Sequence, residues 1–526
     1  MSFFRYDTFC KYLAIIEQSI DVNKYSVDRI HVWPILRFVL CNLLQDDVEP
    51  NKEKNSKIKN TLNRVANSIH HKFDSIKPNI DLIDQIDTSL LTRRNKGIIE
   101  DKSNKKKTVL FIGRTDDYTV EQESGWYSPI IDSWYEIAQN EYSVLKAEIF
   151  EGQVALDLSP RVIPPVLIHP SLTFTTPKDE LLFGSLREKL RLLIEAISRF
   201  STEELGINIK PEPVQQNAES VLLSAMSIRN CLKPFLTKLD VNTVMMGCSY
   251  YYLGYGVHWA AAELSVTSVE LQHGAIGGHH FGYTHCTSIP SSGYILLPKV
   301  LNLWGIESAK YVLRWLPQDH KYHRVVIGGK TLLTEQMLDH RSVSKLQELK
   351  QQACLYQKVI LVSLSGREYV SLTENLIVAI RDSPKDWLWL IRSHPLAQRM
   401  SRDGHDPLRV QQILTEFGIN NYEVDNTTFL PLDTVLALSD HHVTHFSSVY
   451  LEATVHAVPT TFIHPTAETL FKKQIETGSA NLAVDPKQII ESIKNFTLRA
   501  VFNDPNNNEI NTDKGWRIKV LKSIIK

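Results

Sequence analysis

The chain has 526 residues, with 58 basic and 59 acidic side chains and a formal net charge of −1. A nucleic-acid partner held by general electrostatic attraction would need an excess of cations, so this balance argues against one. Hydrophobic residues make up 43% of the chain and charged residues 22%, as in ordinary globular proteins, and the length predicts two or three domains rather than one core.

The six cysteines are scattered and include no CxxC pair, which fits unpaired thiols in a reducing compartment. The first residues lack the basic and apolar regions of a signal peptide. No apolar run approaches the ~20 residues needed to cross a bilayer. These features predict a cytoplasmic protein.

Residues 1–107 are predicted to form an N-terminal extension. Residues 3–45 carry apolar side chains at helical spacing, for example Phe9, Leu13 and Ile16. Residues 50–107 are polar and rich in Lys and Asn, which favours loop and solvated helix. The aromatic residues of the helices either pack on the next domain or lie on a membrane surface. They are Phe3, Phe4, Tyr12, Trp33 and Phe38.

The pattern changes at Thr108–Gly113, a short apolar run that ends in glycine, as a strand buried in a parallel sheet does. Similar runs alternate with helical stretches as far as residue 325, which predicts a doubly wound α/β domain over 108–325. The further strands are predicted at 144–149, 243–246 and 266–271, and the helices at 181–200 and 218–239.

A second series of strands begins near Arg324 and predicts another α/β domain over 326–490, followed by a helical tail at 491–526. The fold class is therefore α/β, with two Rossmann-like doubly wound domains and an N-terminal helical extension. The strands of the second series are predicted at 324–329, 358–364, 387–391, 422–424, 442–444 and 460–463.

Ligands bind beyond the carboxyl ends of the strands in open α/β sheets, so the residues after each strand are the candidate site residues. In the first domain His273 follows a predicted strand and is a candidate general base near neutral pH. The glycines around it would admit a substrate, although a tight turn with a hydrogen-bonded histidine is the alternative. The candidate substrate-binding residues here are Gly274, Gly277, His279 and His280. Because His279 and His280 are adjacent and would point apart, no metal site is predicted.

Asp116 and Asp117 follow the first strand of the same domain and are the other candidates for the base. A salt bridge within the loop is the simpler account of these two carboxylates.

In the second domain, Arg392, His394 and Pro395 follow one strand, where a cation and an imidazole could bind a phosphate. Ser447 and Ser448 follow another strand at the start of a helix, where hydroxyls and free N–H groups attract anions. Glu452, on that helix, could accept hydrogen bonds from ribose hydroxyls. The alternatives are an arginine paired with a surface carboxylate and an ordinary serine N-cap.

Two nucleotide-binding motifs are not matched. The stretch Gly328-Gly-Lys-Thr331 ends like a P-loop, but Arg324 stands where the first glycine of that motif belongs. No GxGxxG follows a predicted strand, which disfavours a nicotinamide-dependent dehydrogenase.

His394-Pro395, followed further along by Ser447-Ser448 and Glu452, resembles the His-Pro and Ser-Ser motifs of bacterial GT-B glycosyltransferases that use CMP-sugars. Sialyl-, polysialyl- and Kdo-transferases of capsule and lipopolysaccharide assembly are examples. The segment 249–274 is similar to the first domain of surface-polysaccharide transferases of this type.

The resemblance implies a GT-B-like pair of domains that moves a sugar from a nucleotide-sugar, CMP-linked by preference, to a surface polysaccharide (capsule or O-antigen) or lipid-linked glycan. It implies no cofactor beyond this co-substrate and no metal. His394, Ser447 and Ser448 would contact the donor phosphate, and Glu452 the ribose. The acidic motif that sialyltransferases carry in the first domain is not matched, because Tyr118 follows Asp116-Asp117. The base therefore stays open between His273 and these aspartates. A CDP-polyol phosphotransferase, a sugar-nucleotide 2-epimerase and a non-catalytic assembly protein are the alternatives.

Overall fold

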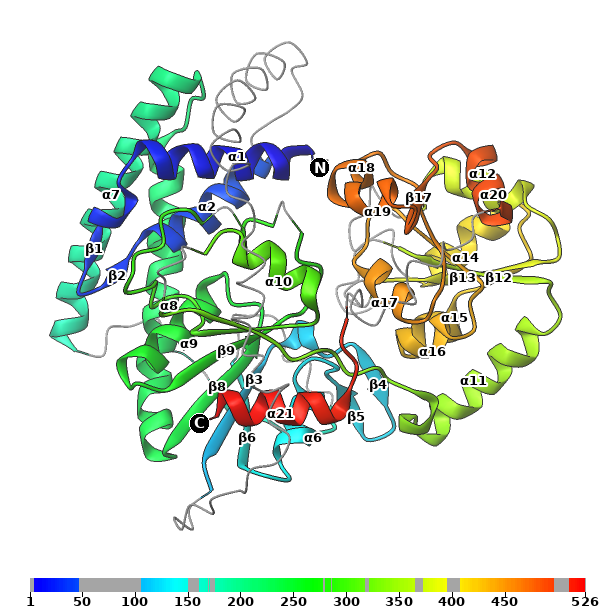
Figure 1. The fold of residues 1–526 in the computed structure, drawn as a ribbon, viewed down its shortest axis with the longest axis horizontal. Helices are drawn as coiled ribbons and strands as arrows, with labels where there is room; N and C mark the ends of the chain where they lie inside the picture. Colours follow the sequence, from blue (N-terminus) through cyan, green and yellow to red (C-terminus); the bar gives the residue numbers. More distant parts are fainter. Residues whose placement is uncertain are drawn as a thin grey trace.

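A computed structural model of the chain contains two α/β domains, each built on one parallel sheet (Figure 1). Together the two sheets confirm the α/β class and the pair of doubly wound domains. The structure describes residues 4–46, 106–149, 160–168, 170, 176–277, 280–284, 286–316, 321–364, 372–394, 407–495 and 510–525.

Seven parallel strands form the first sheet, in the order β11-β10-β9-β8-β3-β6-β7. The chain starts in the middle at β3, adds β6 and β7 on one side and then adds β8 to β11 on the other. The direction of winding therefore reverses between β3 and β8, where ligands of doubly wound sheets bind. The strands are β3 (Thr108–Gly113), β6 (Ser143–Ile149), β7 (Val166–Ile168), β8 (Val241–Gly247), β9 (Thr267–Leu271), β10 (Val300–Leu303) and β11 (Arg324–Ile327).

Helices cover both faces of this sheet because the strands carry apolar side chains on both sides. Leu110 and Ile112 face α8 and α9, whereas Val109 and Phe111 face α6 and α21. No helix in the described ranges is both long enough and apolar enough to cross a membrane. The elements of this layer are η2 (Thr115–Asp117), β4 (Val120–Gln122), β5 (Gly125–Tyr127), α6 (Asp132–Ala138), α7 (Pro177–Leu205), α8 (Pro211–Lys238), α9 (Tyr252–Glu263), α10 (Ile306–Leu313) and α21 (Lys514–Ile524).

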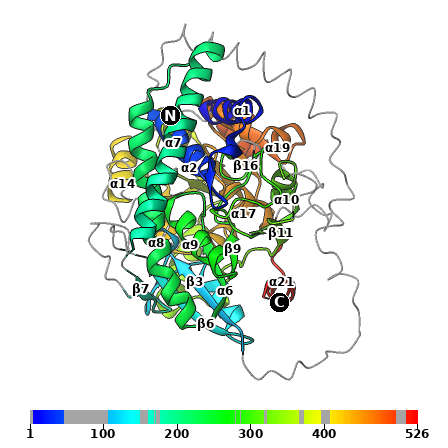
Figure 2. The same ribbon diagram turned by 90° about the vertical axis from the view of Figure 1, so that its left-hand side faces the viewer.

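The N-terminal helices pack beside α7 and α8 (Figure 2). Tyr12 and Trp33 are buried there, so these two aromatic residues pack on the first domain. These helices also support a loop of that domain, because Arg37 donates to the carbonyls of Phe281 and Thr284 at 2.7 and 2.8 Å. The elements of this N-terminal region are α1 (Phe4–Ser19), η1 (Val22–Lys24), β1 (Ser26–Val27), β2 (Ile30–His31) and α2 (Trp33–Asp46).

Six parallel strands form the second sheet, in the order β14-β13-β12-β15-β16-β17. Here too the first strand, β12, is central, and the winding reverses between β12 and β15. The strands are β12 (Lys358–Ser363), β13 (Trp387–Arg392), β14 (Tyr422–Glu423), β15 (His441–Thr444), β16 (Thr460–Phe462) and β17 (Ala480–Leu482).

Helices cover both faces of the second sheet as well. Helices α12, α14 and α20 pack on one face, and α11, α16 and α17 on the other. The helices are η3 (Glu335–Met337), α11 (His340–Ala353), α12 (Glu374–Asp382), α14 (Pro407–Glu416), α15 (Asp425–Phe429), α16 (Leu432–Leu436), α17 (Val449–Val455), α18 (Thr466–Leu470), α19 (Lys472–Glu476) and α20 (Pro486–Asn495).

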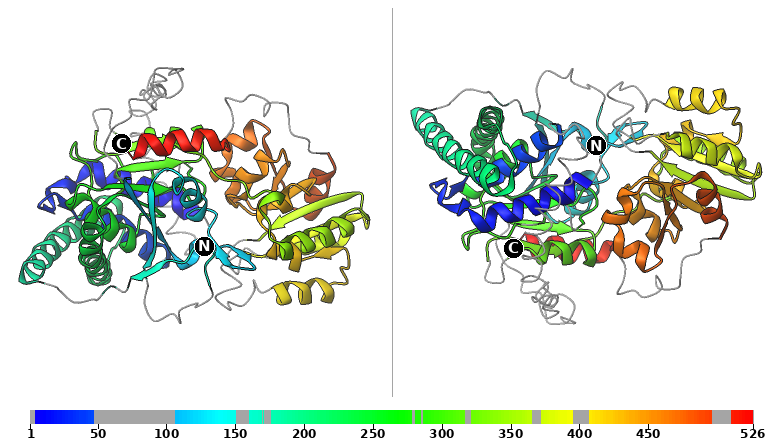
Figure 3. Two further views of the ribbon diagram at one scale, coloured as in Figure 1. Left: turned by 90° about the horizontal axis from the view of Figure 1, so that it is seen from below. Right: turned by 90° about the horizontal axis from the view of Figure 1, so that it is seen from above.

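Two segments belong to a different part of the fold than their sequence indicates. The strand at Arg324, predicted to open the second domain, pairs with β10 and is the last strand of the first sheet. A buried strand shows its apolar character in sequence but not its neighbour, so the pattern could not assign it. The tail helix α21 follows the second domain but returns to the first (Figures 1 and 3), where Leu521 and Ile524 pack with Trp134.

Candidate functional site

The carboxyl edges of the two sheets meet at the junction of the domains. Trp304, directly after β10, lies in one buried apolar cluster with Tyr450 and Leu451 of α17. Ala275, from the loop after β9, and Phe446, from the loop after β15, pack against the same cluster. The loop that carries His273 and the loop that carries the two serines therefore border one interdomain core.

An ion pair links the same two edges. Lys330, in the segment that follows β11, donates to Glu452 Oε1 at 2.6 Å and lies over the Trp304 ring, 5.1 Å from its centroid. Burial alone would lower the pKa of Lys330, but the charges of Glu452 and Asp433 and the hydrogen bond to Glu452 together raise that pKa above its ordinary value. The predicted ribose ligand Glu452 is thus bound to a cation that belongs to the interdomain connection.

On the edge of the first sheet, Asp117 is engaged by its own loop. Its Oδ2 accepts from the Arg114 backbone N–H at 2.9 Å, and its Oδ1 accepts from Arg114 Nη2 at 2.6 Å. Only 1% of the side chain is exposed. The loop salt bridge, the simpler of the two sequence interpretations, is what the structure shows for Asp117. Asp116 lies in the same turn, η2, but its side chain is outside the described part of the chain.

His273 lies beside this ion pair, at the end of β9. A Cβ built on Gly247, the last residue of β8, would be 3.9 Å from His273 Cβ and 3.6 Å from Asp117 Oδ1. Asp117 and His273, the two predicted bases, therefore both lie close to Gly247 at the end of β8. Burial, with the charge of Arg114 and the nearby His280, holds the pKa of His273 well below its ordinary value. His273 is thus neutral near pH 7, and in this environment its ring takes up a proton less readily than an exposed histidine does.

Glu270, which sequence reasoning missed, forms the polar centre of this edge. It is 2% exposed and accepts hydrogen bonds from the hydroxyls of Ser249 and Tyr283. Burial raises the pKa of Glu270 to about 7, although the two hydroxyl donors oppose the shift. The signal in sequence is a carboxylate inside an apolar run, Ser268-Val-Glu-Leu271, which no core requires.

The other predicted residues of this loop contribute in different ways. No described atom lies within 4 Å of a Cβ built on Gly274 or Gly277, so the space beside both glycines is open. Neither glycine has a positive φ, so neither is needed for an unusual backbone conformation. His280 packs against Tyr250 and Tyr283, and burial lowers its pKa to about 4. His279 lies outside the described residues.

On the edge of the second sheet, Arg392 holds a loop in place. Its Nη1 donates to the carbonyls of Thr427 and Leu430 at 2.5 and 2.6 Å, and the residue is 7% exposed. These contacts anchor the end of α15 to β13, and a phosphate contact for Arg392 stays a prediction. His394 is half-buried directly after this strand, and Pro395 is outside the described residues.

Ser447 and Ser448 lie where the sequence places them, between β15 and α17. Ser447 Oγ accepts from the backbone N–H of Val449 at 3.3 Å, whereas the Ser448 side chain makes no capping hydrogen bond. Both are half-buried. Ser448 is the N-cap residue of α17 but makes no capping hydrogen bond, so an ordinary serine N-cap does not account for it, and anion binding by either hydroxyl stays a prediction.

Several buried polar atoms of this second edge have no hydrogen-bond partner among the described residues. They are Ser393 Oγ after β13, both ring nitrogens of His445 after β15 and Glu452 Oε2 on α17. Burial lowers the pKa of His445 to about 3, so its ring is neutral. An unmet buried polar atom costs about 1–3 kcal/mol, and several at one sheet edge indicate a place for a polar ligand.

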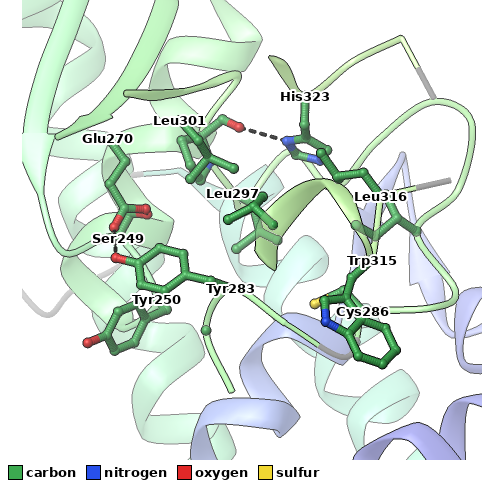
Figure 4. Close-up of a pocket in the computed structure, with 14 residues that line it drawn as sticks. Ser249, Tyr250, Glu270, Tyr283, Cys286, Leu297, Leu301, Trp315, Leu316 and His323 are labelled. Atoms are coloured by element: carbon green, nitrogen blue, oxygen red, sulfur yellow. Dashed lines mark hydrogen bonds between the residues drawn. The ribbon is translucent and has the colours of Figure 1, made fainter. Parts of the chain in front are cut away.

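A cavity lies behind the first edge (Figure 4). Glu270, Ser249 and Tyr283 line one end, and Trp315 and His323 line another part. It holds ≈ 40 Å³ of space for water centres. At about 10–15 Å³ for each water, this is room for a few water molecules and far below the roughly 300–1,000 Å³ of a ligand pocket. In the described ranges, no three His, Cys, Asp or Glu side chains are grouped so that they could hold a metal ion.

Comparison with protein-family models and with curated proteins gives no match. Among solved structures, the chain is similar to a putative UDP-N-acetylglucosamine 2-epimerase from Listeria monocytogenes, with 11% identity over 80% of this chain and 96% of that one and a TM-score of 0.46. It is also similar to UGT71G1 of Medicago truncatula complexed with UDP-glucose, with 10% identity over 80% of this chain and 99% of that one and a TM-score of 0.44. CalG4, the calicheamicin glycosyltransferase, is a further match, with 14% identity over 80% of this chain and 95% of that one and a TM-score of 0.43. These scores are all below 0.5, and the strand orders given above define the fold.

Proposed function

We propose that this protein is a glycosyltransferase that moves a sugar from a nucleotide-sugar to a hydroxyl of a glycan acceptor. The observation that carries the proposal is the meeting of two carboxyl edges with unlike chemistry. One edge presents the neutral imidazole of His273 beside open space, and the other presents buried polar atoms without partners. The first arrangement suits proton transfer, and the second suits binding of a polar donor.

In this proposal His273 removes the proton of the acceptor hydroxyl while the hydroxyl oxygen attacks the anomeric carbon. The nucleotide phosphate leaves toward the second edge, where His394, Ser447 and Ser448 are the predicted contacts. Glu452 Oε2 would accept from a ribose hydroxyl while Oε1 keeps its bond to Lys330. A CMP-linked donor and a surface-polysaccharide or lipid-linked acceptor, in capsule or O-antigen assembly, are the favoured substrates because of the motif resemblance.

The first test is nucleotide binding by calorimetry and thermal unfolding with CMP, CDP, UDP and GDP. A nucleotide at about 100 times its dissociation constant should stabilise the folded chain by ~2.7 kcal/mol. Replacing Glu452 by Gln should weaken binding about 10- to 150-fold, because a hydrogen bond to a charged group contributes roughly 1.5–3 kcal/mol. Glu416→Gln, an exposed glutamate on α14, is the matched control and should bind as the wild type does.

The second test is turnover of nucleotide-sugars without and then with a glycan acceptor, followed by mass spectrometry and NMR. Formation of a glycosylated acceptor only in the second incubation supports transfer. Isomerisation of the donor without acceptor would assign the chain to the 2-epimerases, and transfer of a polyol phosphate to the phosphotransferases. Binding without any turnover favours a non-catalytic assembly protein, and no binding of any nucleotide would contradict the three enzyme functions.

A further inference from the structure

Glu270 is a buried carboxylate that the proposed reaction does not use. Its Oε2 accepts from the Ser249 hydroxyl and its Oε1 accepts from the Tyr283 hydroxyl (Figure 4). An ionised carboxylate can only accept hydrogen bonds, so both hydroxyl hydrogens point at Glu270. The direction of these two bonds is therefore set by the charge of Glu270.

The Tyr283 oxygen has a second neighbour, His273 Nδ1, at 3.4 Å. Since its single hydrogen is given to Glu270, this oxygen faces Nδ1 with a lone pair and accepts the N–H of the ring. Nδ1 itself is 3.9 Å from Glu270 Oε1. The geometry thus places the proton of neutral His273 on Nδ1 and leaves the lone pair on Nε2, which lies 3.3 Å from the Tyr250 hydroxyl.

We propose that Glu270 is a positioning residue for His273, which fixes through the Tyr283 hydroxyl the one imidazole tautomer that can act as a base. Its consequence for catalysis rests on the proposed function, but the tautomer itself does not.

In the reaction, the acceptor hydroxyl replaces Tyr250 as the neighbour of Nε2. The O–H bond of the acceptor breaks and its proton moves to Nε2, while the oxygen forms a bond to the anomeric carbon. The bond from that carbon to the donor phosphate oxygen breaks, and the electron pair leaves on the phosphate. The imidazolium that results has Nδ1 3.9 Å from Glu270 Oε1, and the negative charge of Glu270 opposes the effects of burial and of Arg114, which disfavour the protonated ring.

The arrangement reverses when Glu270 is protonated. Its carboxyl then donates to Tyr283, Tyr283 donates to Nδ1, and the ring proton is found on Nε2, where it blocks proton uptake. Because the pKa of Glu270 is about 7, activity should fall as the pH drops through about 7. The charged and titratable groups that face this network are Arg114, Asp117, Cys248, Tyr250 and His280.

The test is the tautomer of His273 in the full-length protein labelled with ¹⁵N-histidine, observed by long-range ¹H–¹⁵N NMR and assigned with His273→Asn. At pH 8 the wild type should carry the proton on Nδ1, and lowering the pH through about 7 should move it to Nε2. Tyr283→Phe should lose the preference for Nδ1. Tyr250→Phe, which removes the hydroxyl at the other nitrogen, is the matched control and should keep it.

A Tyr283→Phe protein with the tautomer of the wild type would overturn the proposal, as would an equal change in Tyr250→Phe. Glu270→Gln is a second variant, in which the pH-dependent change should disappear. None of these readouts needs a donor sugar, so failure of the proposed function does not change their result. Where turnover is found, Tyr283→Phe should lower kcat on the order of 10²-fold with unchanged nucleotide affinity.

Discussion

The two carboxyl edges that meet at the domain junction differ in how the polar groups beside the candidate residues are satisfied, although Tyr118 Oη and both amide atoms of Asn302 on the first sheet also lack a partner among the described residues. On the first sheet, Asp117 is paired with Arg114, and Glu270 accepts from two hydroxyls. On the second sheet, Ser393 Oγ and Glu452 Oε2 are buried without a partner among the described residues. Polar groups that are hydrogen-bonded to one another are held in one geometry. Buried polar groups without a hydrogen-bond partner destabilise the fold until a ligand or water binds to them. In the proposed function, the first edge therefore carries the proton transfer and the second binds the donor.

The largest expected effect comes from removing the base. His273→Asn should lower kcat by about 10²–10⁴-fold, the usual contribution of a general base, and leave the dissociation constant of the nucleotide nearly unchanged. Steady-state kinetics and calorimetry on the same protein separate the two quantities. A variant that loses nucleotide affinity instead would place His273 in the binding site and remove the contrast between the edges.

The next effect concerns stability against pH at the first edge. The pKa of Glu270 is about 7 in the folded protein, above the ordinary 4.5, so the folded state holds the proton more tightly than the unfolded state does. The stabilisation that this gives is complete below about 4.5 and is lost as the pH rises to about 7, by up to ~3 kcal/mol. Urea unfolding between pH 5 and 8 measures it against Glu270→Gln, where this loss should be absent. If the free energy of unfolding changes with pH equally in both proteins, the raised pKa of Glu270 is contradicted.

The smallest effect compares two buried serines, one on each edge. Ser249→Ala removes a donor to Glu270 and should lower the free energy of unfolding by about 1–3 kcal/mol. Ser393→Ala removes an unpartnered buried hydroxyl and should raise the free energy of unfolding by up to about 1–3 kcal/mol, while weakening nucleotide binding by about 0.5–1.5 kcal/mol. Denaturant unfolding and calorimetry give both numbers. Equal changes in the free energy of unfolding and in nucleotide affinity for the two variants would contradict the proposed difference between the two sheet edges.

Much of the sheet architecture could be predicted because buried parallel strands are short apolar runs. The runs at Thr108–Gly113 and Lys358–Leu364 coincide with β3 and β12, each the central strand of its sheet. The short strands β7, β10 and β17 went unpredicted, whereas β15 and β16, which are as short, were predicted at 442–444 and 460–463. The strand at Arg324 has the right pattern but was assigned to the wrong sheet, because pairing is a long-range choice.

The candidate site was predictable only at the strand ends. His273 and the pair Ser447-Ser448 stand out because polar residues follow an apolar run, and both loops do border the same interdomain core. Glu270 and His445 were overlooked because each lies within or directly after a strand and resembles a core position. Arg392 was predicted as a phosphate ligand, yet its contacts to two backbone carbonyls depend on where α15 packs.

The sequence by itself determined the local features of this protein: the apolar runs that become strands, and the polar residues that end them. Burial of both faces of a parallel sheet demands such runs, so they are visible in one dimension. Only the tertiary structure decided which groups are partners. The bond between Lys330 and Glu452, and the contact of Tyr283 with both Glu270 and His273, arise from chain segments that the fold brings together. Hydrogen bonds act over a few ångströms in space, and sequence spacing does not encode those distances.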